Sequence, residues 1–275
     1  MKESQERITE PVYRATRNKL SRPLETAPFY FLSALLIFVL WQVAVMVTSE
    51  SARRFLIPTP GAVVTRFVRL LRDGTLVFHT RVTLLEMALG LLTGTAVALI
   101  FGYAVAHSRV VAYLLEPIIV VSQAVPIVAL APLLTVWFGS GLTSKVVVCA
   151  LIVFFPILVN VTTGLKTIDP EIRDLFRLLE ANRAQVLLHL EIPGALPDFL
   201  AGLKVGGTLA AMGAVVGEFV ASTEGLGYLV KQGQNLYDLP MMFVAIITLM
   251  AIATTVYALM TLLERLLLRW RQAGA

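Results

Sequence analysis

Six long runs of apolar residues constrain the fold of this chain more than any other feature of its sequence. A helix needs about 20 apolar residues to cross the hydrocarbon core of a bilayer. Of the 275 residues, 57% are hydrophobic and 15% are charged, whereas a soluble domain carries about 25% charged residues. The sequence therefore predicts an all-α membrane protein with six transmembrane helices, at Phe29–Thr48, Val82–Ala106, Ala112–Phe138, Thr143–Leu165, Phe199–Ala221 and Met241–Leu263.

Lys and Arg predict the orientation of these spans. An even number of spans places residues 1–28, 166–197 and 266–275 on one side of the membrane, and that side carries the larger share of Lys and Arg. Because cytoplasmic loops are enriched in these residues, we expect two cytoplasmic tails, 1–28 and 266–275, around a membrane domain at 29–265. The net charge of +5 is assigned to these flanks and not to nucleic-acid binding, since no basic stripe with interleaved aromatic residues is present. No cleaved signal peptide is expected at the N-terminus.

Small residues and prolines predict how the spans pack. Gly90, Gly94, Ala98 and Gly102 recur at every fourth position, which favours close approach of another helix. The prolines of the third span predict a kinked interior helix. The three histidines stand near predicted membrane edges, so an interfacial location is expected for His79, His107 and His189.

The segment 166–197, between the fourth and fifth spans, predicts a pair of short helices. Asp169 followed by Pro170 is a helix start, so a helix is expected over Glu171–Glu180. Asn182 and Gln185 have the spacing of a capping box, which predicts a second helix that runs to Ile192 and is ended by Pro193 and Pro197. A cytoplasmic helix pair of this kind offers a surface for another protein.

Two motifs of this segment and five motifs elsewhere in the chain form a distinctive set. They are Leu178-Leu-Glu-Ala-Asn-Arg-Ala-Gln-Val186, Leu190-Glu-Ile-Pro-Gly-Ala-Leu-Pro197, Phe55-Leu-Ile-Pro-Thr-Pro-Gly-Ala-Val63, Ala124-Val-Pro-Ile-Val-Ala-Leu-Ala-Pro-Leu133, Trp137-Phe-Gly139, Gly213-Ala-Val-Val-Gly-Glu-Phe219 and Gly225-Leu-Gly-Tyr228. The segment resembles the signature loop of binding-protein-dependent ABC transporter permeases, in the branch that transports nitrate, sulfonate and taurine. The resemblance covers about residues 29–265, and the run Gly213–Phe219 is similar to importers of thiamine-precursor pyrimidines or riboflavin.

The resemblance implies a type I ABC importer permease that inserts its loop into a groove on a dimeric ATPase subunit. ATP and Mg²⁺ would then be bound by that partner, and this chain would bind no cofactor or metal and perform no catalysis. A periplasmic or lipid-anchored binding protein would deliver the solute, and a homodimer in the membrane lipid of the bacterial inner membrane would form the pore. The loop residues implied are Asp174, Leu175, Leu178, Leu179, Glu180, Ala181, Asn182 and Arg183.

Two departures from the family pattern lie in this loop. Asp174-Leu175-Phe176 replaces a Glu-Ala-Ala triplet, and Glu180 replaces a glycine. Because a side chain in the left-handed region costs roughly 1 kcal/mol, we expect the corner to be built differently, with Asn182 in the unusual conformation.

Glu218 is the main polar residue predicted inside a span, and an intramembrane carboxylate is a functional candidate. It shares a helix face with Ala214, Ala211 and Gly207, so it is expected to point at a neighbouring helix or the pathway rather than at lipid. A gate role and a structural role, as an ion pair or a helix cap, both remain open. The complete set of pathway candidates is Ser122, Gln123, Pro126, Asn160, Met212 and Glu218.

Two other functions are alternatives to a permease. A secondary transporter tends to show inverted repeats and carboxylates at mid-membrane depth, and neither pattern is evident in the sequence. An intramembrane enzyme needs a reactive group with a partner, and no such constellation is evident. The sequence also contains no Gly-x-x-x-x-Gly-Lys-Ser/Thr loop, so ATP hydrolysis by that route requires another polypeptide.

Overall fold

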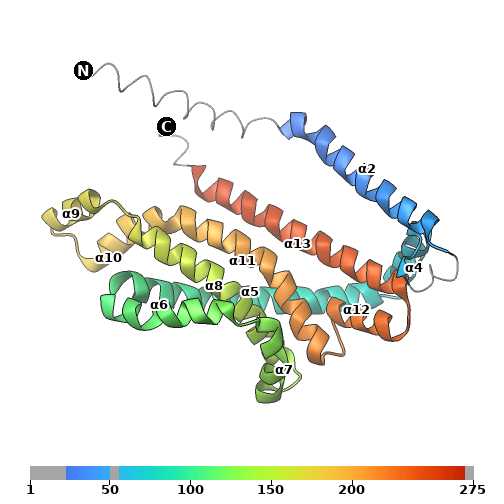
Figure 1. The fold of residues 1–275 in the computed structure, drawn as a ribbon. Coiled ribbons are helices and arrows are strands. Elements are labelled where there is room, and N and C mark those ends of the chain that lie inside the picture. The colour runs from blue at the N-terminus through green and yellow to red at the C-terminus, as the bar shows by residue number, and fades with distance from the viewer. Residues whose placement is uncertain (1–22, 50–55, 270–275) are drawn as a thin grey trace. The chain divides into compact units, whose positions relative to one another are not determined.

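The computed structural model describes residues 23–49 and 56–269, and all regular structure in this part is helical (Figure 1). It separates into two compact units, residues 1–60 and 61–275, of which the first contains α2. In chain order the elements are α2 Pro23–Val47, α4 Pro60–Arg72, α5 Thr75–His107, α6 Arg109–Ala124, α7 Ile127–Phe138, α8 Leu142–Lys166, α9 Pro170–Leu178, α10 Arg183–Val186, the π-helical turn η1 Leu187–Glu191, α11 Ile192–Ala221, α12 Leu226–Asn235 and α13 Leu239–Leu267.

Four stretches among the described helices are long and apolar enough to cross a membrane. They are α5, α8, α13 and the run Arg183–Val220, which joins α10, η1 and α11. The first predicted span lies in α2, whose described apolar part is the shorter stretch Leu35–Val47. The predicted tails 1–28 and 266–275 fall largely outside the described residues, although α2 begins at Pro23 and α13 continues to Leu267.

The third predicted span is two helices and not one kinked helix. α6 ends at Ala124 and α7 begins at Ile127, with Pro126 in an extended conformation between them. A proline disfavours the helical conformation of the residue before it and has no N–H to donate. The break therefore falls at Val125 and Pro126, whereas Pro117 and Pro132 are accommodated inside α6 and α7.

The core of the second unit is α8 packed between α5 and α11. The small-residue face of α5 contacts α8, and a Cβ added to Gly94 would lie 2.7 Å from the carbonyl oxygen of Ala150. On the other side of α8, a Cβ added to Gly213 of α11 would lie 2.7 Å from Cys149 Cα. The predicted close packing of α5 is thus confirmed, because these backbones approach too closely for any larger residue.

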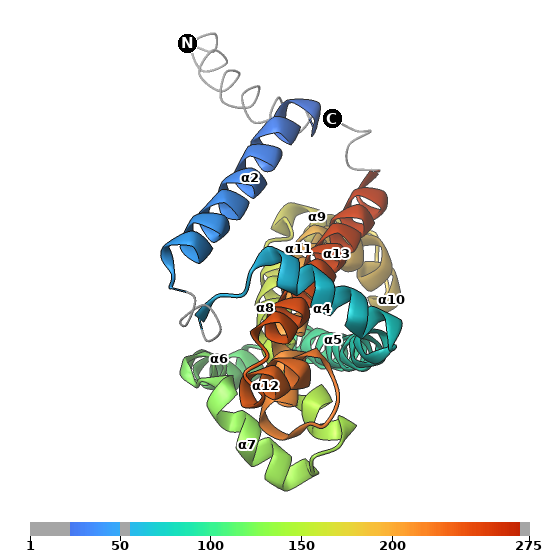
Figure 2. The ribbon, with the colours of Figure 1, turned by 90° about the vertical axis from the view of Figure 1, so that its right-hand side faces the viewer.

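The two ends of this bundle carry different elements. We call the end with α9 and α10 the loop end and the end with α4 and α12 the α12 end (Figure 1). Figure 2 views the unit from the α12 end. There α4 is held to the start of α13 by an ion pair in which Arg66 Nη2 lies 2.6 Å from Asp238 Oδ2.

Candidate functional site

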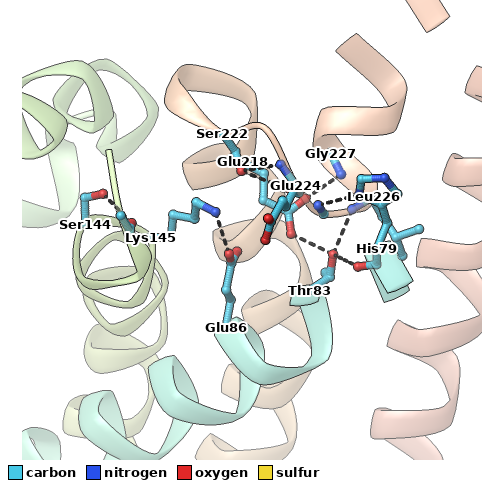
Figure 3. Close-up of polar contacts among 12 residues, drawn as sticks. His79, Thr83, Glu86, Ser144, Lys145, Glu218, Ser222, Glu224, Leu226 and Gly227 are labelled. Atoms are coloured by element: carbon cyan, nitrogen blue, oxygen red, sulfur yellow. Dashed lines mark hydrogen bonds and ion pairs between the residues drawn. The ribbon is translucent and has the colours of Figure 1, made fainter. Parts of the chain in front are cut away.

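At the α12 end, side chains from α5 and α11 cap the start of α12 (Figure 3). The N–H of Gly225 donates to His79 Nδ1 at 2.9 Å, and the N–H of Leu226 donates to Thr83 Oγ1 at 2.8 Å. The N–H of Gly227 donates to Glu218 Oε2. The first N–H groups of a helix have no partner within that helix, so these three acceptors satisfy donors that would otherwise be buried and unpaired.

Glu218 is fully buried and lies at the centre of this arrangement. Besides the N–H of Gly227, its carboxylate accepts a hydrogen bond of 2.6 Å from the hydroxyl of Thr83. The side chain thus points at a neighbouring helix, and its partners are a helix start and a hydroxyl. The arrangement has the geometry of a helix cap supplied by another helix.

Gly225 is required at this junction for two reasons. Its φ of 105° lies in a region that L-residues with a side chain rarely adopt. A Cβ at this position would also collide with the Glu218 carboxyl group. The motif Gly225–Tyr228 therefore places the first N–H groups of α12 directly against Glu218.

A buried ion pair lies beside this cap. Lys145 Nζ of α8 donates to Glu86 Oε1 of α5 at 2.8 Å, and the two side chains are 9% and 0% exposed. The second carboxylate oxygen of Glu86 has no hydrogen-bond partner among the described residues. A cavity of about 620 Å³ adjoins the pair and is also lined by Ser140, Ser222, Thr223 and Glu224.

Sequence reasoning missed most of this cluster. His79 lies near the start of α5 and is 8% exposed, and Lys145 lies near the start of α8 and is 7% exposed, so both polar side chains are buried in the bundle. α5 begins at Thr75 instead of Val82, so His79 lies on the same helix as Thr83 and Glu86, which the predicted span already contains. Their spacing of four and three residues puts them on one helix face that continues to Gly90, and this periodicity was a signal in the sequence.

The other pathway candidates are scattered. Pro126 stands exposed at the break between α6 and α7, and Met212 is 56% exposed on α11. Asn160 packs against Gly202 inside the bundle and donates to the carbonyl of Pro156 at 2.8 Å. Ser122 and Gln123 belong to α6, and their side chains lie outside the described part of the structure.

The loop end is built from local caps. Asp169 accepts the N–H of Glu171 at the start of α9, and Asn182 and Gln185 form the predicted capping box. α9 has no buried residue, and its apolar side chains extend into solvent, with Leu178 82%, Leu179 69% and Leu175 51% exposed. Asp174 and Arg177 form an exposed ion pair on the same helix.

The corner between α9 and α10 differs from the expectation. Glu180 has a φ of 52°, in the left-handed region, while Asn182 has a φ of −71°. The prediction that Asn182 takes the unusual conformation is wrong, because its side chain is engaged in the capping box, which requires an extended backbone at the cap. Glu180 therefore adopts the conformation that a glycine would adopt more readily.

The prolines that follow do not end the second helix. η1 connects α10 to α11, and Ile192 donates its N–H to Leu187 O, five residues earlier. Pro193 has no N–H, and its ring crowds the preceding turn of a regular α-helix. The wider π-helical turn accommodates it, so the chain stays helical from Arg183 to Ala221.

No cluster of three His, Cys, Asp or Glu that could hold a metal ion is found within residues 23–49 and 56–269. Residues 90–269 match the family described as "Binding-protein-dependent transport system inner membrane component". Similar proteins include the riboflavin transport system permease protein RibX of Chloroflexus aurantiacus, with 44% identity over 86% of this chain and 87% of the relative.

Two further relatives are more distant. The formylaminopyrimidine transport permease protein ThiX of Halalkalibacterium halodurans is 32% identical over 86% of this chain and 94% of the relative. The taurine transport system permease protein TauC of Escherichia coli is 30% identical over 86% and 87%. Among solved structures, an inward-facing MetNI methionine ABC transporter chain has a TM-score of 0.61 at 18% identity, covering 68% of this chain and 93% of that one. This last likeness concerns the fold alone.

Proposed function

Because the chain belongs to the family of binding-protein-dependent transport system inner membrane components, and is thus an ABC transporter permease, we propose that it forms the solute pathway of an ATP-driven importer. On this proposal six spans cross the bacterial inner membrane, supplied by α2, α5, α6 with α7, α8, α11 and α13. Both termini and the loop 166–197 then face the cytoplasm. Two copies of the chain form the pathway, and a periplasmic or lipid-anchored binding protein delivers the solute.

The exposed apolar face of α9 is the observation that supports an ATPase partner. Leu175, Leu178 and Leu179 are all more than half exposed at the loop end, on a helix with no buried residue. Fully burying a leucine side chain contributes about 1.5–3 kcal/mol, so covering these three residues would favour docking of a partner. The partner supplies ATP hydrolysis and binds the Mg²⁺, and this chain needs no cofactor of its own.

A small nitrogen heteroaromatic compound is the solute class that we propose. The relatives named for riboflavin and formylaminopyrimidine are 44% and 32% identical to this chain, and the relative named for taurine is 30% identical. Riboflavin and formylaminopyrimidine both contain a pyrimidine-type ring, whereas taurine is a sulfonate without a ring. The identity to the riboflavin permease therefore favours a heteroaromatic solute over a sulfonate or nitrate.

In this proposal the pathway candidates fall into two groups, one exposed on the surface and one inside the bundle. Pro126 and Met212 present accessible surface to a second copy of the chain or to solute. Glu218 and Asn160 act from inside the bundle by holding helices in position. The cavity beside Glu86 and Lys145 is the candidate for the outer end of the pathway.

Leu179→Asp tests the proposed contact with the ATPase. The substitution puts a charge into an apolar interface, so copurification with a co-expressed ATPase subunit should be lost while the isolated permease keeps its thermal midpoint. Leu179→Met is the matched control and should assemble normally. Normal copurification of the Asp variant would contradict the proposed contact.

Riboflavin-stimulated ATP hydrolysis in proteoliposomes that contain the permease, the ATPase and the binding protein tests the solute class. Stimulation by riboflavin or a pyrimidine and not by taurine is the expected result. Stimulation by taurine alone would contradict the heteroaromatic proposal and leave the permease function intact.

A further inference from the structure

A second buried ionic contact joins α5 to the π-helical turn at the loop end. His107, the last residue of α5, places Nε2 2.7 Å from Glu191 Oε1, the last residue of η1. The Glu191 side chain is 5% exposed and the His107 side chain 31%. The contact therefore lies at the edge of the bundle with its carboxylate inside.

The two ring nitrogens of His107 both face acceptors. Nδ1 lies 3.0 Å from the carbonyl oxygen of Tyr103, which accepts hydrogen bonds and does not donate them. Nδ1 therefore carries a hydrogen, and the Nε2 contact to Glu191 contains another proton between nitrogen and oxygen. A hydrogen bond between a charged imidazole and a carboxylate is stronger than a neutral one. The Tyr103 ring, stacked on the imidazole at 4.0 Å, fixes the orientation further.

Glu191 stands at the junction between two helices. It ends the π-helical turn between α10 and α11, and such turns are frequent at functional sites. This turn is the covalent connection between α10 and the long α11. At the same place, His107 connects the turn to α5.

α5 extends from this contact to the cap of α12. It is one helix of 33 residues, which at 1.5 Å per residue spans about 50 Å. One end carries His107, and the other end carries His79 and Thr83, which hold the N–H groups of Gly225 and Leu226. The two ends of the bundle are thus joined by a rigid element with a specific polar contact at each end.

We propose that His107 and Glu191 are positioning residues that transmit movement of the loop 166–197 into α5 and so to α12. This inference rests on the proposed function, because it takes an ATPase as the source of the movement. The exposed ion pair of Lys166 with Glu116 is the matched comparison at the loop end, with side chains that are 46% and 53% exposed. Exposed pairs of this kind contribute little, so this one should transmit nothing.

The test needs no solute. In a Cys149→Ala background, Ser222→Cys places a thiol beside the start of α12, and a membrane-impermeant maleimide reports its accessibility in the assembled transporter. Addition of ATP and vanadate should change the labelling rate in this parent chain. The double variant His107→Leu/Glu191→Leu avoids an unpaired buried carboxylate, and it should hydrolyse ATP but lose the change in labelling.

Three further variants keep the proposal falsifiable. His107→Gln/Glu191→Gln preserves shape and should lose most of the response, whereas His107→Lys keeps a cationic donor and should retain it. Lys166→Gln/Glu116→Gln should respond as the parent does. The proposal would be overturned if both double variants at 107 and 191 showed the same change in labelling rate as the parent. It would also be overturned if an assembled parent that hydrolyses ATP showed no change in labelling rate. A parent that does not bind the ATPase would instead overturn the proposed function.

Discussion

At the α12 end the first N–H groups at the start of α12 are satisfied by buried side chains from two other helices, whereas at the loop end apolar side chains stand in solvent on short, locally capped helices. His79, Thr83 and Glu218 each accept an N–H from α12, so that end is completed within one chain. Leu178 and Leu179 contact no core, so the loop end needs a partner to bury them. Side chains of the same chain thus cap the start of α12, whereas the exposed leucines at the loop end are available for assembly with a partner.

Among these substitutions, Lys145→Met at the α12 end should reduce the stability of the protein most. It leaves Glu86 as an unpaired buried carboxylate, which costs about 3–5 kcal/mol. Thermal unfolding in detergent should show a much lower midpoint, with little folded protein recovered. Glu86→Leu/Lys145→Met removes both charges and should recover most of the stability. If the double variant is as unstable as Lys145→Met, the unpaired Glu86 carboxylate is not the cause of the lower midpoint.

Glu218→Ala should have the next largest effect. The N–H of Gly227 loses its acceptor, and a buried unsatisfied group costs about 1–3 kcal/mol, whereas the hydroxyl of Thr83 still has the carbonyl oxygen of His79 at 3.1 Å. Glu218→Gln retains a carbonyl oxygen for Gly227 and should unfold close to the parent temperature. The exposed neighbour Glu224 supplies the control, since Glu224→Gln should leave the unfolding midpoint unchanged. If Glu218→Ala unfolds at the same temperature as the parent, the cap does not contribute to stability.

Glu180→Gly should have the smallest effect on stability, and it should raise the unfolding midpoint. A glycine adopts the φ of 52° without the steric cost of a side chain, which is about 1 kcal/mol. The gain is expected in the unfolding midpoint of the permease with its ATPase, where the loop is held. Glu180→Ala keeps a Cβ and should give no gain, so equal midpoints for the two variants would contradict the strain at this corner.

The caps of the loop were predictable because their partners are close in sequence. Asp169 with Glu171, and Asn182 with Gln185, make contacts that span two or three residues, so spacing alone specifies them. The conformation of Glu180 was not predictable in the same way. The capping box fixes Asn182 in an extended conformation, and the turn must then be completed at another residue.

The buried cluster was only partly predictable. Glu218 was singled out because a carboxylate in an apolar run is rare, and its placement toward a neighbouring helix followed from helical periodicity. Its partners Thr83 and Gly227 come from α5 and α12, and no local rule pairs them. The pairing of Lys145 was not predictable from spacing, because its partner Glu86 is 59 residues away in sequence.

Four features could be read from the amino-acid sequence alone: the helical membrane class, the positions of most spans, the close packing face of α5 and the caps of the loop. Each of these depends on composition or on contacts within a few residues, where propensity and periodicity act. Tertiary packing was needed to specify which of the prolines breaks a helix, and to pair Glu86 with Lys145 and His107 with Glu191. These features depend on which helices become neighbours, and buried polar groups choose their partners only once packing has excluded water from around them.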